Sequence, residues 1–185
     1  MADSPWDMLS AVGTLAAVVV ALGVSGHTAW ASRRAEKDRS ELAAAKMLSP
    51  IIALERKAGY LYAFFSFDEE ESVEQHASAL LAIQELEVMA KAISIDDLYP
   101  LLHLKNHAAK RAARALGLIQ TFSADAIATL SHSSWGALRV RKFQYERWSG
   151  MLSEINDHLS VVVSACADSA STGAPRPTPE EIHGP

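Results

Sequence analysis

Two histidines four residues apart are the first feature of the sequence that could do chemistry. On a helix, His103 and His107 would lie one turn apart and could present two nitrogens to one metal ion. A metal site needs a third and a fourth ligand, however, and no His-Glu-x-x-His pattern occurs. We therefore interpret them as ordinary surface or half-buried histidines, and the sequence predicts no metal-ligating residue.

The single cysteine, Cys166, is the only thiol that could act as a nucleophile. It occupies an apolar position of a helical pattern, and no basic residue is spaced to activate it, so we expect a small core residue. The sequence also lacks a glycine-rich phosphate loop and a nucleophile elbow. We predict no catalytic or cofactor-binding residue and disfavour an enzyme. A metal-dependent or hydrolytic enzyme whose residues gather inside a bundle stays an alternative.

Charge is divided unevenly along the chain. Residues 66–98 hold nine acidic residues against Lys91, whereas residues 101–149 hold eight basic residues against Asp125 and Glu146. This complementarity favours placing the acidic helix beside a basic one. A solvated basic face is the favoured interpretation, because no nucleic-acid motif accompanies it and the net charge of the chain is -5. The alternative is a face for lipid headgroups or nucleic acid, formed by Lys105, Lys110, Arg111, Arg114, Arg139, Arg141 and Lys142.

The elements that would position these residues are four apolar seams at helical spacing. The first three contain Ile51, Leu54, Ala58, Leu61 and Phe65; then Ala79, Ile83, Leu86, Ala90 and Ile93; then Leu101, Leu104, Ala108, Ala112, Ala115, Ile119 and Phe122. The fourth contains Leu138, Arg141, Tyr145, Trp148, Leu152, Ile155, Leu159, Val162 and Cys166. No strand alternation interrupts them. The sequence therefore predicts an all-α fold with an antiparallel four-helix bundle over residues 49–168.

Helix-capping and helix-breaking residues between the seams predict where the helices begin and end. Ser49-Pro50 marks a new helix or a kink, and Ser72 with Gln75 has the spacing of a capping box. Ser94 to Pro100 is the next break, and residues 123–134 are expected to form a short helix or loop. Residues 33–48 are rich in helix formers and predict a stalk, whereas prolines and polar residues in 169–185 predict an unstructured tail.

An uncharged apolar run near the N-terminus predicts a membrane anchor over residues 1–32. No Asp, Glu, Lys or Arg lies between Asp7 and Arg33, and Leu9 to Trp30 is long enough for a helix across the bilayer of about 30 Å. Trp6 and Trp30 stand at its ends, where aromatic rings prefer the interface. The lipid bilayer is thus the first expected partner, through residues 9–30.

Basic residues on one flank predict the orientation of this anchor. The flank that follows it carries Arg33, Arg34, Lys37, Arg39 and Lys46, so the C-terminal domain should lie in the cytoplasm and the N-terminus outside. A cleaved signal peptide is the competing interpretation, because residues 29–31 have the small-x-small form of a cleavage site. It is disfavoured by the absence of a basic segment before the apolar run.

Small residues recur every four positions within the anchor. Gly13, Ala17, Ala21 and Ser25 would lie along one face of the helix, where small side chains let a second helix approach closely. The pattern is consistent with a homo-oligomer, although alanine and glycine are common in spanning helices in any case.

The stretch from Trp6 to Leu22, Trp-Asp-Met-Leu-Ser-Ala-Val-Gly-Thr-Leu-Ala-Ala-Val-Val-Val-Ala-Leu, resembles the start of many uncharacterised one-span membrane proteins of bacteria and their prophages. The resemblance covers the anchor, about a tenth of the chain. It implies a bacterial inner membrane and supplies no activity, cofactor or site residue.

Besides the enzyme alternative above, these features lead to one leading functional hypothesis and one alternative of a different class. The first is a membrane-anchored cytoplasmic helical module for interaction or assembly, which holds an unidentified protein partner or associates with itself. The alternative is a phage-related or defence-type effector that perturbs the membrane under the control of its soluble domain.

Overall fold

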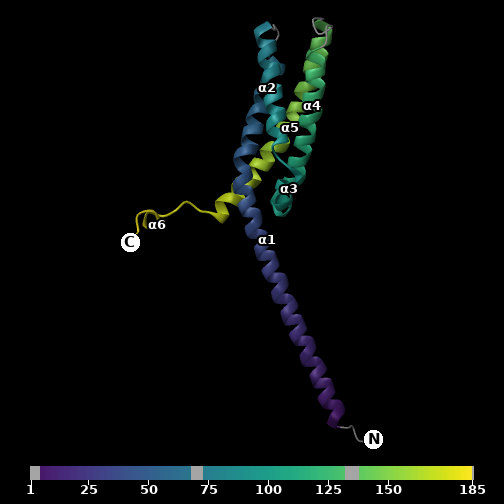
Figure 1. Cartoon of the computed structure of the whole chain (residues 1–185), viewed down its shortest axis with the longest axis vertical. Coiled ribbons are helices and arrows are strands. Elements are labelled where there is room, and N and C mark those ends of the chain that lie inside the picture. The colour runs from purple at the N-terminus through teal and green to yellow at the C-terminus, as the bar shows by residue number, and fades with distance from the viewer. Residues whose placement is uncertain (1–4, 68–72, 132–137, 185) are drawn as a thin grey trace. The chain divides into compact units, whose positions relative to one another are not determined.

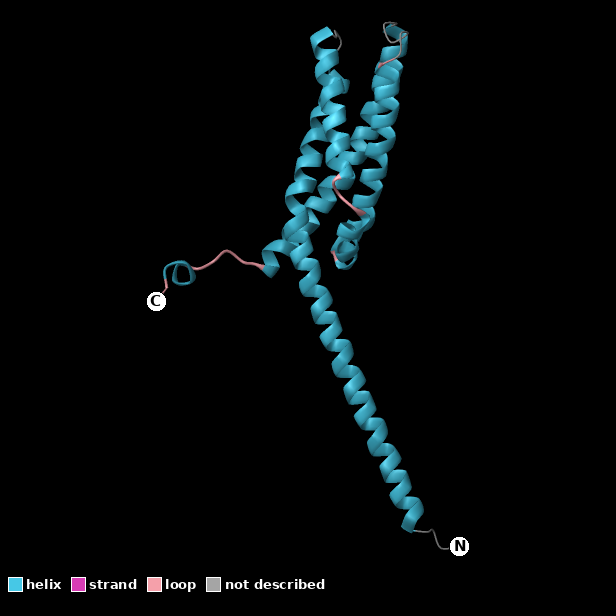
Figure 2. Ribbon diagram, viewed as in Figure 1, coloured by secondary structure: helices cyan, strands magenta, loops and turns pink. Residues whose placement is uncertain are grey.

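A computed structural model describes the chain except residues 1–4, 68–72, 132–137 and 185, and the side chains of some further helical residues are also outside the description. The described residues form helices and contain no strand (Figure 2), which confirms the predicted all-α class. In chain order the elements are α1 (Pro5–Phe67), α2 (Val73–Lys91), α3 (Ile95–Leu98), the 3-10 helices η1 (Tyr99–His103) and η2 (Lys105–His107), α4 (Ala108–Leu130), α5 (Leu138–Gly173) and α6 (Pro179–His183).

The chain divides into two compact units, residues 1–38 and residues 39–185. The first unit is the N-terminal part of α1. Among the side chains that are described, no helix is both long and apolar enough to cross a bilayer. The predicted span from Leu9 to Trp30 includes residues 9–13, 16 and 17, whose side chains lie outside the description, so the span stays a prediction. Of the predicted small-residue stripe, Ala21 and Ser25 are exposed, while the side chains of Gly13 and Ala17 are not described.

The second unit is built around a single apolar core to which α1, α2, α4 and α5 all contribute. These four helices lie side by side, each antiparallel to the next along the chain (Figure 1). This core includes an aromatic cluster in which Phe65, near the C-terminal end of α1, contacts Phe122 of α4 and both Tyr145 and Trp148 of α5, with ring centroids 5.0 to 6.2 Å apart. Trp148, Leu152 and Ile155 are fully buried, as the fourth seam predicts.

The predicted seams match the buried residues closely. Every member of the first seam is buried, and the second and third seams depart from this only at Ile93 and Leu104, which are partly buried against the core. In the fourth seam, Tyr145 is half-buried and every later member is buried. The side chain of Leu138 lies outside the described residues. Helical periodicity alone therefore locates the core.

The boundary between stalk and bundle differs from the prediction. Residues 39–48 belong to the second unit, and Ala44 and Met47 are buried in its core. The helix also continues through Pro50, so of the two expected alternatives, a new helix or a kink, the new helix is wrong. Pro50 lacks an N–H, but the buried Met47 and Ile51 on either side hold the chain against the core, and this packing offsets the lost backbone hydrogen bond.

The third predicted helix begins later and ends later than expected. Ser94 caps α3 through a capping box with Asp97, and the two 3-10 helices follow before α4 starts at Ala108. Leu101 is buried from a 3-10 helix, which also places residues three apart on one face. At the other end α4 continues to Leu130. The prediction of a separate short helix or loop is therefore wrong for residues 123–130. The proposed capping residue Ser72 lies outside the described residues.

The C-terminal tail is more helical than its composition suggests. Helix α5 continues to Gly173, beyond the predicted boundary at residue 168, and α6 follows with its own capping box between Thr178 and Glu181. Proline at the first turn of α6 is compatible with a helix because the N–H of that position needs no intrahelical partner.

Candidate basic groove between α4 and α5

The turn that starts α4 is the element that positions the candidate site. Asn106 and His107 both adopt left-handed backbone angles, with φ of 59° and 55°. Such a pair of non-glycine residues is uncommon and costs backbone energy. The Nε of Arg111, one turn into α4, donates a hydrogen bond of 3.0 Å to the carbonyl oxygen of Asn106 and so ties the helix to this turn.

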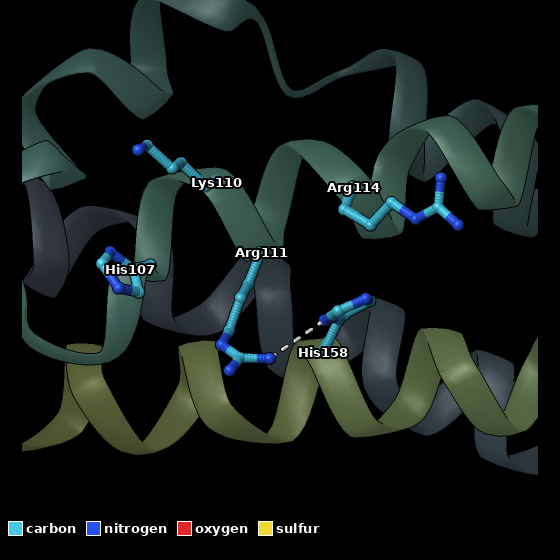
Figure 3. Close-up of a pocket in the computed structure, with 5 residues that line it drawn as sticks. All are labelled: His107, Lys110, Arg111, Arg114 and His158. Carbon is cyan, nitrogen blue, oxygen red and sulfur yellow. Dashed lines mark hydrogen bonds between the residues drawn. The ribbon is translucent and has the colours of Figure 1, made fainter.

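Arg111 also connects α4 to α5. Its Nη1 lies 3.3 Å from Nδ1 of His158, and the contact is partly buried (Figure 3). A guanidinium can only donate, so Nδ1 of His158 accepts, and in this contact the imidazole is neutral with its proton on Nε2. That Nε2 lies 3.6 Å from Oε1 of Glu154, beyond hydrogen-bond distance.

Arg114, one turn further along α4, is paired with the same carboxylate. Its Nε and Nη2 donate to Oε1 of Glu154 at 3.2 and 3.0 Å. Both side chains are about half exposed, so this ion pair contributes only tenths of a kcal/mol up to about 1 kcal/mol. It nevertheless fixes one carboxylate beside the groove.

Together these residues line a shallow groove of about 330 Å³ on the bundle surface: His107, Lys110, Arg111, Arg114 and His158. Figure 3 shows Arg111 and His158 pointing toward each other across the two helices, with Lys110 and Arg114 directed outward on either side. Lys110 and Arg111 make no ion pair with a carboxylate among the described residues, while Arg114 is balanced by Glu154. The groove therefore carries uncompensated positive charge.

The sequence anticipates part of this groove. Of the seven basic residues assigned to a face for anions, the structure brings Lys110, Arg111 and Arg114 together. Lys105 instead pairs with Asp168 at 2.5 Å, and the side chain of Arg139 lies outside the described residues. Arg141 and Lys142 lie on α5, and neither lines the groove.

His158 is the groove residue that sequence reasoning missed. It lies 47 positions from Arg111, so no local spacing connects the two. The available signal was Glu154, four residues before His158 on one helix face, which is a spacing that brings side chains together.

The charge pattern predicts the neighbour of α2 correctly but not its ion-pair partner. Helix α2 packs beside the basic helix α4. Its described ion pair to another helix, however, joins Glu85 to Lys57 of α1 at 2.6 Å, whereas Asp125 of α4 pairs with Arg147 of α5. Apolar contacts therefore hold α2 against α4.

His103 and His107 do not lie one turn apart on a single regular helix, as their spacing in the sequence predicted. The two residues belong to different 3-10 helices, with the left-handed Asn106 between them, so they do not share one face of a regular helix. Over the residues that the structure describes, three or more ligating side chains nowhere come together in an arrangement that could hold a metal.

Cys166 lies buried in the core, as expected from its seam position. Burial raises the pKa of the thiol to about 11, because the thiolate loses its hydration. A nucleophilic cysteine requires the opposite shift.

Comparison with known proteins yields no match. No protein-family model matches the chain, and neither a curated protein nor a solved structure is significantly similar to it.

Proposed function

We propose that the protein is a single-pass membrane protein of the bacterial inner membrane whose helical bundle serves as an interaction or assembly module on the cytoplasmic side. The N-terminal part of α1 is the anchor in this proposal, and the bundle over residues 39–173 is the module.

The observation that carries the proposal is the exposed apolar surface of the described residues between positions 15 and 24 of α1. Within the first unit Leu15, Val18, Val19, Val20, Leu22 and Val24 are each at least half exposed. Consecutive residues on an α-helix point about 100° apart, so Val18 to Val20 alone face three different directions. A partner helix would cover one stripe of this surface, whereas hydrocarbon covers every side.

The polar groups near the end of this segment suit a membrane interface. The hydroxyl of Thr28 donates a hydrogen bond of 2.7 Å to the carbonyl of Val24, and this internal bond satisfies the hydroxyl where water is scarce. Two residues later the exposed ring of Trp30 lies 5.7 Å from the guanidinium carbon of Arg34. Tryptophan and arginine side chains of this kind favour the headgroup region.

The basic flank supports a cytoplasmic bundle. Arg33, Arg34, Lys37, Arg39 and Lys46 follow the apolar segment, and the segment before it carries only Asp3 and Asp7. Because short flanks rich in lysine and arginine stay on the cytoplasmic side, the bundle should remain there.

Membrane retention with a matched pair of variants tests the anchor. The native full-length chain should remain in the membrane pellet after alkaline extraction, and a reporter fused to its C-terminus should show cytoplasmic activity. Val19→Arg with Leu22→Arg should reduce retention, since each arginine at the centre of a span costs about 2.5 to 3.5 kcal/mol. Leu42→Arg with Leu81→Arg changes two leucines of the bundle that are also more than half exposed, and it should leave retention intact.

Two results would contradict the proposal. Release of the native chain by alkaline extraction would exclude the anchor. Depolarisation of the membrane on expression, followed with a potential-sensitive dye and dependent on residues 1–32, would replace the interaction module with the membrane-perturbing effector.

A further inference from the structure

Arg111 carries a charge that no carboxylate among the described residues compensates. Its guanidinium is partly buried between α4 and α5, where it donates to a backbone carbonyl and to a neutral imidazole but meets no carboxylate among the described residues. A charge that is partly removed from water without a counter-ion is unfavourable. We propose that the groove lined by His107, Lys110, Arg111, Arg114 and His158 binds a phosphate-bearing anion.

The donors that remain in the groove suit such a ligand. Arg111 uses Nε and Nη1 internally and leaves Nη2, while Arg114 uses Nε and Nη2 and leaves Nη1. Nε2 of His158, which lies 3.6 Å from Oε1 of Glu154, is a further donor when Nδ1 accepts from Arg111. Lys110 adds a flexible ammonium from the first turn of α4. The helix dipole adds positive potential at that end.

The shape of the ligand follows from the lining. A phosphate group offers several strong acceptors and more than one negative charge, which matches donors that arrive from two helices at different angles. A volume of about 330 Å³ suits a compact anion. Among the described residues that line the groove there is no Phe, Tyr or Trp, and so none of the large rings on which a nucleobase usually stacks. The ligand is therefore recognised through its phosphate, and pyrophosphate is the simplest probe.

The carboxylate of Glu154 is a negative charge beside this groove that an anion would meet. This carboxylate would repel the anion if it were not held by Arg114. When the anion binds, Arg114 keeps Glu154 neutralised while Arg111 and Lys110 supply the attracting charge. Binding should therefore weaken as salt rises, because both cations are screened.

The phosphate could belong to a soluble molecule or to a lipid headgroup, and two titrations distinguish them. The full-length chain, purified in a neutral detergent, is titrated with inorganic pyrophosphate and, separately, with mixed micelles that contain phosphatidic acid. Saturable one-to-one binding of pyrophosphate supports a soluble ligand. Binding that requires phosphatidic acid supports a lipid headgroup. Absence of binding in both titrations overturns the proposal.

Variants connect the binding to the groove. Arg111→Gln and His158→Asn should each weaken binding about tenfold, the factor that one hydrogen bond to a charged group contributes. Arg111→Lys keeps the charge but loses the planar fork, so it should also weaken binding if it folds normally. Lys142→Gln is the control, because it removes an exposed charge of α5 outside the groove. Equal losses for Lys142→Gln and Arg111→Gln would show nonspecific attraction and overturn the proposal.

The outcome of the titrations does not depend on the outcome of the membrane-retention test of the anchor. The groove lies entirely within the second unit, so binding of pyrophosphate can succeed even if alkaline extraction releases the chain, and it can fail when the chain is retained.

Discussion

The indole nitrogen of Trp148 on α5 donates a hydrogen bond of 2.7 Å to the carboxylate of Asp125 on α4. Trp148 is completely buried in the aromatic cluster, while Asp125 sits at the edge of the core and also pairs with Arg147 at 3.0 Å. A buried indole N–H needs an acceptor. Asp125 therefore fixes the position of the largest side chain in the core from outside the apolar seam.

Asp125→Ala should destabilise the bundle through this contact. It removes the carboxylate acceptor from a buried N–H, at a cost of about 1 to 3 kcal/mol in the free energy of unfolding, measured by denaturant titration. Asp125→Asn keeps a carbonyl oxygen as acceptor and should recover much of the loss. Arg147→Gln removes the partly exposed ion pair with Asp125 and a long hydrogen bond of 3.5 Å to Gln144, and it keeps the indole contact, so it should cost about 0 to 1 kcal/mol. If Arg147→Gln costs as much as Asp125→Ala, the indole contact contributes nothing measurable.

Trp148→Ala tests the packing of the fourth seam itself. Loss of a fully buried tryptophan should lower the free energy of unfolding by about 3 to 5 kcal/mol, a large share of the stability of a single domain. Glu154→Ala, off the seam on the same helix, removes only a half-exposed ion pair and should cost at most about 1 kcal/mol. Similar melting of both variants would show that the bundle packs through another face.

The parts of this architecture that depend on neighbouring residues in the sequence could be predicted, and the parts that depend on contacts between distant residues could not. Burial of Ile51, Leu54 and Trp148 follows from the helical period, because one apolar stripe must face the core wherever the helix lies. The start of α4 could not be predicted in the same way. Leu101, Leu104 and Ala108 keep steps of three and four through two 3-10 helices, so the apolar pattern hides the left-handed turn at Asn106 and His107.

Contacts between distant positions explain what sequence reasoning missed in the site. Arg111 meets His158, and Trp148 meets Asp125, only because α4 and α5 pack in one particular register. Counting charges along residues 101–149 predicted a basic face, but it could not predict which of the basic side chains gather in the groove. Likewise, Pro50 interrupts a helix by local rules, and only the buried residues on both sides show why α1 continues.

The thiol of Cys166 should be nearly unreactive in the folded protein. It is buried, and its pKa is raised to about 11, so the thiolate is scarce at neutral pH. Ellman's reagent at mildly alkaline pH should label the native chain slowly and the denatured chain at once. Fast labelling of the native chain would place the thiol at an accessible position and contradict the packed seam.

Asp97 should make the stability of the bundle depend on pH in an acidic window. The Ser94 hydroxyl, at 2.6 Å, and the Lys46 ammonium, at 3.0 Å, lower the pKa of its carboxyl from 3.8 to about 2. Since the folded-state pKa is the lower one, the contribution to stability is present above pH 3.8 and is lost as pH falls through about 2. The difference in unfolding free energy between the native chain and Asp97→Asn should therefore be constant near neutral pH and shrink across this window. Ser94→Ala removes the largest cause of the shift, so the folded-state pKa of Asp97 should rise toward 3.8, and the loss should become smaller and end at a higher pH. If the difference in unfolding free energy between the native chain and Asp97→Asn does not change with pH below 4, the carboxylate does not tie α3 to Lys46 of α1 in solution.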